Sequence, residues 1–149
     1  MRLRQILLNV MHKVAVFLLI LSVILSVASC EKVSLPSSLD EAGTRMLAAG
    51  LDISFTESSE DLAELADNFD FDMSGKLTGY MTVKETGSDD LVLEILRFEL
   101  LSDLKAAGDY LSGRRLSAER ESGINEKGEY LLWFGTPKAV AVLLTEVQK

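Results

Sequence analysis

Residues 91–100 read LVLEILRFEL, the strongest strand signal in the chain. Its branched apolar residues favour a β-strand, but apolar and polar positions alternate imperfectly, so a helix is the alternative interpretation. A second apolar run, YLLWF at residues 130–134, predicts a buried strand by its composition. These two runs place a β-sheet at the centre of the second half of the chain.

A helix is predicted after each of these strands. Ser102 is expected to cap the first of them, SDLKAAGDYLSGRR over residues 102–115. Thr136 is the expected N-cap of the second and Pro137 its first residue, in the positions that these residue types favour. The apolar faces of the two helices are Leu104, Ala107 and Leu111, and Val140, Leu143, Leu144 and Val147.

The first half of the chain has weaker signals. Residues 40–49 are a weakly patterned helical stretch that Gly50 ends. A better helix over residues 58–69 is expected to be capped by Ser58 or Ser59. The remaining expectations are a short strand or a connection at 51–55, a short strand at 80–83 and a turn-rich segment at 123–128.

Strands that alternate with helices over short loops predict a small sheet with helices packed on it. We therefore expect an α+β fold, a small two-layer sandwich with a short sheet of two to four strands, preceded by an N-terminal signal helix. No internal repeat, low-complexity run or second linker interrupts the chain after residue 38, so residues 39–149 are expected to form a single α+β domain.

The first 29 residues differ from the rest and predict a signal peptide. Residues 1–13 are basic and contain no acid, and residues 14–28 are apolar except for two serines. A basic start, an apolar run and a small-residue end are typical of a secretory signal peptide. The alternative is a retained transmembrane anchor, although residues 14–28 as a helix would span about 22 Å, short of the ~30 Å hydrocarbon core.

The end of this segment resembles the lipobox of bacterial lipoproteins. Residues 27–30 read Val-Ala-Ser-Cys, an aliphatic residue and two small ones before the only cysteine of the chain. The resemblance implies that Cys30 receives a diacylglyceryl group and follows a cleaved lipoprotein signal peptide of residues 1–29. Residues 30–38 would then be a tether. Ordinary secretion, which leaves Cys30 as a free N-terminal thiol, and an accidental match are the alternatives.

The charge of the chain bears on its partners. From residue 31 on, 12 Lys and Arg stand against 23 Asp and Glu, a net charge of −11. Such a surface is repelled by anionic lipid and by nucleic acid, whereas two acyl chains give stable membrane attachment without help from charge. We therefore expect a lipid-anchored domain that stands off the extracytoplasmic face of the cell membrane and has no nucleic-acid partner.

The residue inventory excludes several chemistries. The only histidine, His12, lies in the expected signal peptide, and the only cysteine is the expected lipidation site. The expected mature domain therefore lacks Ser-His-Asp and Cys-His catalysis, zinc sites built from His and Cys, and redox disulfides. No enzymatic activity, cofactor or metal is expected.

One motif suggests calcium. Asp70, Asp72 and Ser74 supply oxygens at positions 1, 3 and 5 of a calcium loop, with Gly75 at position 6. Position 12 is Met81, where such a loop needs a bidentate glutamate. The alternative interpretation is a helix end that runs into a turn.

Other candidates have ordinary interpretations. Ser102 and Lys105 match S-x-x-K, but a helix cap explains the serine. Solvated faces explain the carboxylates near Arg97, and local charge balance explains the arginine cluster. Tyr130 and Trp133 are expected in the core. The carboxylates are Asp89, Asp90, Glu94 and Glu99, and the cluster is Arg114, Arg115 and Arg120.

The last part of the chain resembles a known family. A strand LVLEILRF, a helix ending in Gly-Arg-Arg, and GEYLLWFG before an apolar helix resemble an uncharacterised bacterial lipoprotein family. This family is the domain of unknown function 4358, common in Gram-positive anaerobes. With the helix that starts at Ser59, the resemblance covers about the last 90 residues. It implies a lipid-anchored extracytoplasmic α+β domain and brings no catalytic residues.

The expected function is a non-enzymatic binding or accessory module, lipid-anchored through Cys30, whose partner is a protein or another component of the cell envelope. The alternative is a small calcium-binding or metal-dependent hydrolytic module that uses the oxygens of Asp70, Asp72 and Ser74.

Overall fold

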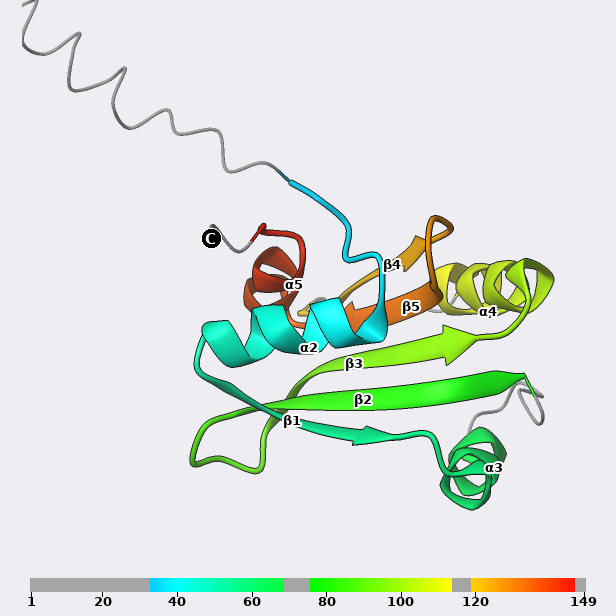
Figure 1. Ribbon diagram of the computed structural model, residues 1–149, viewed down its shortest axis with the longest axis horizontal. Coiled ribbons are helices and arrows are strands. Elements are labelled where there is room, and N and C mark those ends of the chain that lie inside the picture. Colours follow the sequence, from blue (N-terminus) through cyan, green and yellow to red (C-terminus); the bar gives the residue numbers. More distant parts are fainter. Residues whose placement is uncertain (1–32, 69–75, 114–118, 147–149) are drawn as a thin grey trace, which may run out of the picture. The chain divides into compact units, whose positions relative to one another are not determined.

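A five-stranded antiparallel β-sheet forms the centre of the fold (Figure 1). The computed structural model describes residues 33–68, 76–113 and 119–146. The strands lie in the order β1-β2-β3-β5-β4, and each pairs antiparallel with its neighbours, so β1 and β4 are the edges. Their bounds are β1 Leu51–Thr56, β2 Leu77–Glu85, β3 Leu91–Phe98, β4 Glu121–Asn125 and β5 Tyr130–Gly135.

Four helices accompany the sheet in the described residues, and hydroxyl side chains begin three of them. Ser38, Ser58 and Thr136 each accept a hydrogen bond from a backbone N–H in the first turn of α2, α3 and α5, respectively. The predicted cap at Thr136 is confirmed. Of Ser58 and Ser59, the two candidates for the cap of α3, Ser58 is the cap. The helices are α2 Leu39–Ala48, α3 Ser59–Asp67, α4 Leu101–Gly113 and α5 Pro137–Leu143.

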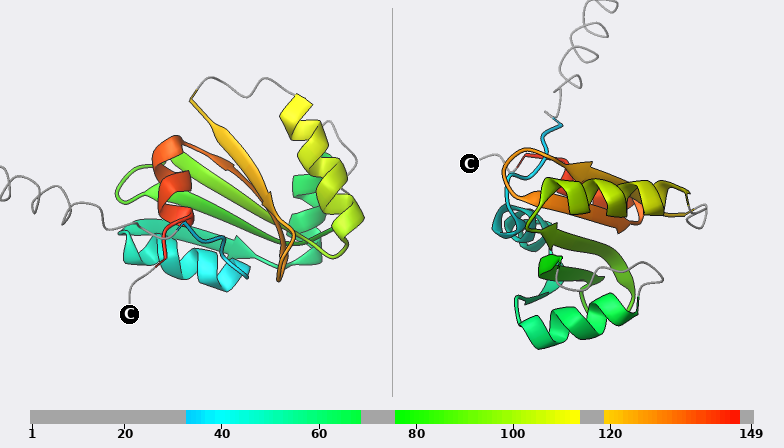
Figure 2. Two further views of the ribbon diagram at one scale, coloured as in Figure 1. Left: turned by 90° about the horizontal axis from the view of Figure 1, so that it is seen from above. Right: turned by 90° about the vertical axis from the view of Figure 1, so that its right-hand side faces the viewer.

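The apolar residues of the sheet form two clusters on opposite faces. Leu93, Ile95 and Trp133 cluster with residues of α2 and α5. Leu96 and Leu132 cluster with residues of α3 and α4. Because successive residues of a strand point to opposite faces, α2 and α5 cover one face and α3 and α4 the other. The left view in Figure 2 shows α2 and α4 on opposite sides of the sheet.

The predicted α+β class with helices packed on a sheet is confirmed, and so is strand rather than helix for residues 91–98. The finer prediction is wrong in two respects. The sheet has five strands instead of two to four, and its helices lie on both faces, which makes three layers instead of two.

The strand that was missed is β4, in the segment that Gly123 and Asn125 marked as turn-rich. Gly123 lies opposite Trp133 in the sheet, and a Cβ at Gly123 would stand 2.6 Å from the indole Cζ2. Glycine is therefore required here by the packing of a tryptophan and does not mark a turn.

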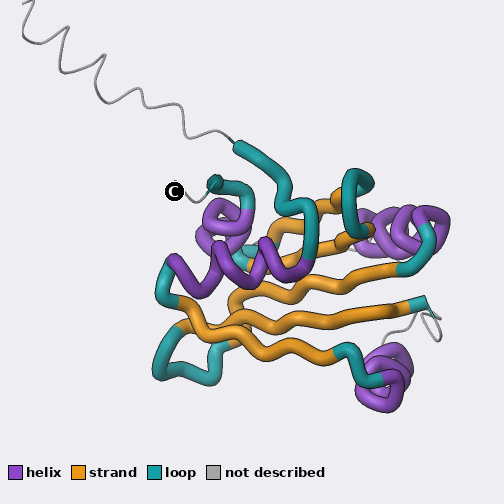
Figure 3. Tube along the Cα trace, viewed as in Figure 1, coloured by secondary structure: helices purple, strands orange, loops and turns teal. Residues whose placement is uncertain are grey.

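Two tight turns close the hairpins (Figure 3). The β2–β3 turn contains Gly87 with φ 77°, and the β4–β5 turn contains Gly128 with φ 83°. Both values lie in the left-handed region that favours glycine.

Two helix boundaries differ from expectation. The Leu104 N–H donates to the Leu100 carbonyl at 3.2 Å, so α4 begins at Leu101 and the predicted cap Ser102 lies inside its first turn. Helix α5 ends at Leu143, before two residues of its predicted apolar face, because the chain then pairs through Thr145 with Val33. The segment of the expected signal helix, residues 1–29, lies outside the described residues, within which no helix is long and apolar enough to cross a membrane.

Candidate functional site

Several predicted site residues lie outside the part of the chain that the structure describes. The calcium-loop hypothesis, and with it the alternative of a calcium-binding or hydrolytic module, therefore stays a prediction. Lipidation of the cysteine likewise stays a prediction. The residues are Cys30, the loop residues Asp70, Asp72, Ser74 and Gly75, and Arg114 and Arg115.

Residues 33–38, the described part of the expected tether, are bound along the domain. We call these residues, with the two side chains that hold them, Arg45 and Asn125, the clasp. These are the two buried polar side chains of the described residues, 3% and 1% exposed. The Ser34 N–H donates to the Leu144 carbonyl at 2.9 Å, and the Glu129 N–H donates to the Ser37 carbonyl at 2.8 Å. The segment is thus an integral part of the fold.

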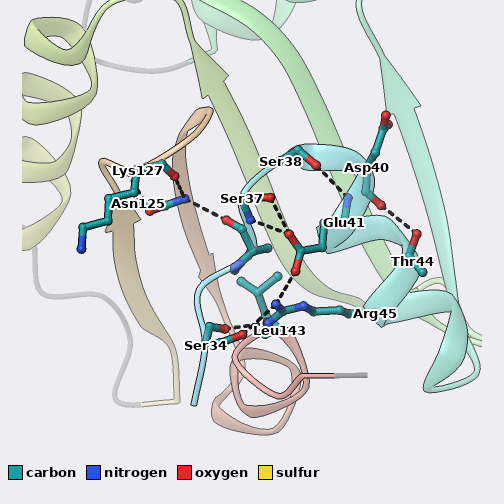
Figure 4. Close-up of polar contacts among 11 residues, drawn as sticks. Ser34, Ser37, Ser38, Asp40, Glu41, Thr44, Arg45, Asn125, Lys127 and Leu143 are labelled. Carbon is teal, nitrogen blue, oxygen red and sulfur yellow. Dashed lines mark hydrogen bonds and ion pairs between the residues drawn. The ribbon is translucent and has the colours of Figure 1, made fainter. Parts of the chain in front are cut away.

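Arg45 joins three elements in the clasp (Figure 4). Its Nη1 donates to the carbonyls of Ser34 at 2.6 Å and of Leu143 at 2.7 Å. Its Nη2 donates to Ser34 Oγ at 3.0 Å and to a carboxylate oxygen of Glu41 at 2.5 Å. Hydrogen bonds from Ser37, and then the one from Arg45, lower the pKa of Glu41 to about 2. The guanidinium therefore ties the N-terminal segment to α2 and to the end of α5.

Asn125 holds the other part of the segment (Figure 4). Its Nδ2 donates to the carbonyls of Pro36 at 2.8 Å and Lys127 at 2.6 Å, and its Oδ1 accepts the Lys127 N–H at 3.0 Å. Beside it, a Cβ at Gly128 would stand 2.3 Å from the Ser37 carbonyl oxygen. The β4–β5 turn and residues 36–37 are therefore in direct backbone contact.

A half-buried polar row lies on the α3/α4 face of the sheet. The Tyr80 hydroxyl donates to Glu94 Oε1 at 2.6 Å, and Arg120 Nη1 stands 3.6 Å from Glu94 Oε2. Burial raises the pKa of Glu94, and burial together with the hydrogen bond to Glu94 raises the pKa of Tyr80. The row joins β2, β3 and the chain before β4.

The interpretation of the carboxylates as solvated faces is right for three of them and wrong for Glu94. Asp89, Asp90 and Glu99 are exposed, and Asp89 contacts Lys84 at 3.4 Å. Glu94 alternates with Leu93 and Ile95 in β3, and this alternation was the available signal that it lies on the opposite face from them. Arg97 contacts none of the four and pairs with Glu57 at 2.5 Å and Glu129 at 3.3 Å.

The aromatic candidates and the S-x-x-K motif have structural roles. Trp133 is 4% exposed in the core, and Tyr130 is half-buried against the other cluster, in agreement with the prediction. Lys105 reaches Glu126 at 3.6 Å, and no hydrogen bond joins it to the exposed Ser102 in the described residues.

Two open grooves lie on the α3/α4 face. The α4–β4 groove has a volume of about 450 Å³ and the α3–β1 groove about 370 Å³, both within the range of ligand sites. The first is lined by Lys105, Gly108, Asp109, Ser112, Ser122, Gly123, Ile124, Glu126 and Leu132. The second is lined by Ser54, Phe55, Thr56, Asp61, Glu64, Leu65, Asn68, Tyr80 and Thr82.

The described residues hold no group of three His, Cys, Asp or Glu side chains arranged to bind a metal ion. No protein-family model matches the chain, and no curated protein or solved structure is significantly similar to it. The resemblance to the lipoprotein family thus stays a prediction, and functional proposals depend on the geometry of this chain.

Proposed function

We propose that the protein is a bacterial lipoprotein, anchored by lipid on Cys30 at the extracytoplasmic face of the cell membrane, and that its domain is a non-enzymatic binding or accessory module. Its partner is an envelope protein. The lipobox-like residues 27–30 and the acidic composition support this proposed localisation.

The clasp is the observation that carries this proposal. The chain immediately after the expected anchor is held by buried Arg45 and Asn125 and by backbone hydrogen bonds to α5 and the β4–β5 turn. Two buried polar side chains that serve one segment indicate that its position matters, because burying such groups is costly unless they are bonded.

The clasp also shortens the expected tether. Residues 31 and 32 alone separate Cys30 from the bound segment, and an extended chain over these three peptide steps reaches about 10 Å. The lipid would therefore hold the domain close to the membrane, in place of the longer stand-off that a free tether over residues 30–38 would allow. A short attachment suits a module that works beside a membrane protein.

Replacement of Cys30 tests the anchor. The wild type should incorporate a clickable fatty acid in a bacterial host, and Cys30→Ser should abolish the labelling and change membrane fractionation. Ser29→Ala is the matched control, since it keeps a small residue before the cysteine and should label like the wild type. An unlabelled wild type, or a Cys30→Ser variant that fractionates unchanged, contradicts the proposal.

A further inference from the structure

The outer edge of β4 is open. Strand β4 ends the sheet order and pairs with β5 on one side. In the described part of the chain, its residues make no backbone hydrogen bond outside the pairing with β5. The left view in Figure 2 looks onto this edge, and no described helix or strand covers it. A row of unpaired N–H and C=O groups is a template for one more strand.

The α4–β4 groove runs beside this edge. Its floor holds Ile124 and the buried Leu132, and Gly108 of α4 lies against Ile124, since a Cβ there would stand 3.1 Å from Ile124 Cγ2. Its rim carries hydroxyl and charged groups, among them Ser122 on β4 and Asp109 on α4. Apolar floor, polar rim and open backbone edge thus lie together at one site.

We propose that the α4–β4 groove binds an extended polypeptide segment with basic side chains, which adds a sixth strand along β4. This inference rests on the binding-module part of the proposed function and names the partner chemistry. Another extended backbone matches the alternating donors and acceptors of a strand edge, and alternate side chains of the added strand would enter the groove.

The charged residues of the α4–β4 groove favour a basic partner. Lys105 already pairs with Glu126 at 3.6 Å. Asp109, on the α4 side of the groove, has no ion-pair partner among the described residues, so the groove offers its unpaired carboxylate to a lysine or arginine. A second copy of this chain fits poorly, because pairing two β4 edges would bring together two domains of net charge −11.

The opposite edge is less suited. At one end of β1, the Thr86 hydroxyl donates to the Gly50 carbonyl at 2.6 Å and contacts the Asp52 carboxylate at 3.2 Å. In the α3–β1 groove, polar groups already bond to one another: the Thr56 hydroxyl donates to Asp61 at 2.8 Å. These groups are satisfied within the chain, so the β4 edge is the better docking surface.

Two exposed serines give a matched test. Ser122 lines the α4–β4 groove and Ser54 lines the α3–β1 groove, each from an edge strand. A lysine at an edge strand opposes the addition of another strand, and in the α4–β4 groove it would also repel a basic peptide. Ser122→Lys should therefore block the site, and Ser54→Lys should leave it intact.

The experiment selects a phage-displayed library of random decapeptides on the full-length chain in detergent. Enriched peptides should be rich in Lys and Arg and should slow amide hydrogen exchange across residues 121–125. Their affinity should fall about tenfold or more in Ser122→Lys, as expected for the loss of one or two backbone hydrogen bonds and an ion pair. Ser54→Lys should change it less than about twofold, because an exposed substitution away from the site has little effect.

Other outcomes overturn the inference. These are a selection that enriches no peptide, peptides that bind Ser122→Lys as tightly as the wild type, and a dimer whose β4 amides are protected without peptide. A chain that takes up fatty acid but binds no peptide refutes this inference alone. A chain that binds peptide through β4 but takes up no fatty acid refutes the lipid anchor alone.

Discussion

The two faces of the sheet use their polar groups differently. Beside α2 and α5, Arg45 and Asn125 are buried and bonded to the N-terminal segment, so polar chemistry there holds the chain to itself. The α3/α4 face carries two open grooves, and the Tyr80–Glu94–Arg120 row lies beneath it. On one face, buried polar side chains bind the N-terminal segment of the same chain, whereas the other face keeps its grooves open.

The largest expected effect breaks the clasp at Asn125. Asn125→Asp removes both Nδ2 donors and places a carboxylate against two carbonyl oxygens in a site that is 1% exposed. We expect the free energy of unfolding to fall by about 3–5 kcal/mol. Chemical denaturation measures this loss.

Asn68→Asp is the matched control. Asn68 Nδ2 donates to the Glu64 carbonyl on an exposed surface at the end of α3. The same change there should cost less than about 1 kcal/mol. Equal losses at the two sites would contradict the claim that the clasp is a buried, essential contact.

The next effect compares the two hairpin turns. Gly87 and Gly128 have nearly the same φ, 77° and 83°, but a Cβ at Gly87 meets nothing within 4 Å, whereas one at Gly128 would stand 2.3 Å from the Ser37 carbonyl oxygen. Gly87→Ala should cost about 1 kcal/mol from backbone strain, and Gly128→Ala about 3 kcal/mol because the clash is added. Thermal unfolding of the two variants gives the comparison, and a Gly128→Ala loss no larger than that of Gly87→Ala would show that the N-terminal segment is not held against the turn.

The smallest effect contrasts two glutamates through pH. The pKa of Glu41 is lowered to about 2, so the folded state holds fewer protons than the unfolded state between pH 2 and 4.5, and stability rises with pH there. The pKa of Glu94 is raised above 4.5, so the folded state holds more protons above that pH, and stability falls as pH rises through the folded value.

Denaturant unfolding from pH 2 to 7 should show these opposite slopes. Glu41→Gln should reduce the rise in the free energy of unfolding between pH 2 and 4.5, which we call the acid limb. The reduction should be less than about 1 kcal/mol, because the 39% exposed side chain is screened by solvent. Glu94→Gln should remove the decline above pH 4.5 and leave the acid limb unchanged. Glu60→Gln, at an exposed acid of α3, is the control. A Glu41→Gln variant that keeps the wild-type acid limb would contradict the bonding of Glu41 within the clasp.

Local signals predicted much of the secondary structure. The caps at Ser58 and Thr136 and the apolar spacing of Leu104, Ala107 and Leu111 were readable because they depend on neighbours within one turn of helix. The strand at residues 91–98 was readable from its branched residues. The boundary at Ser102 was not predicted correctly, because α4 begins at Leu101, two residues before the start that a cap at Ser102 implies.

Long-range contacts limited the prediction of the site. Gly123 and Asn125 indicated a turn, but one faces Trp133 across the sheet and the other bonds the Pro36 carbonyl, 89 residues away in sequence. The spacing of Glu41 and Arg45 indicated an i,i+4 pair, but the burial of Arg45 had no sequence signal, since its other partners Ser34 and Leu143 lie in distant segments. Glu94 could have been recognised from its place in β3, but its partner Arg120 could not.

Composition and local patterns were enough to give the α+β class, most helices, the central strands, the acidic charge and the expectation of a lipid-bearing Cys30. These depend on local periodicity and composition, which the chain carries wherever it folds. The structure was needed to show that helices cover both faces, that β4 is an edge strand beside a groove, and that residues 33–38 belong to the fold. Those outcomes depend on which distant residues come into contact, and buried groups such as Arg45 and Asn125 find their partners only when the sheet has formed.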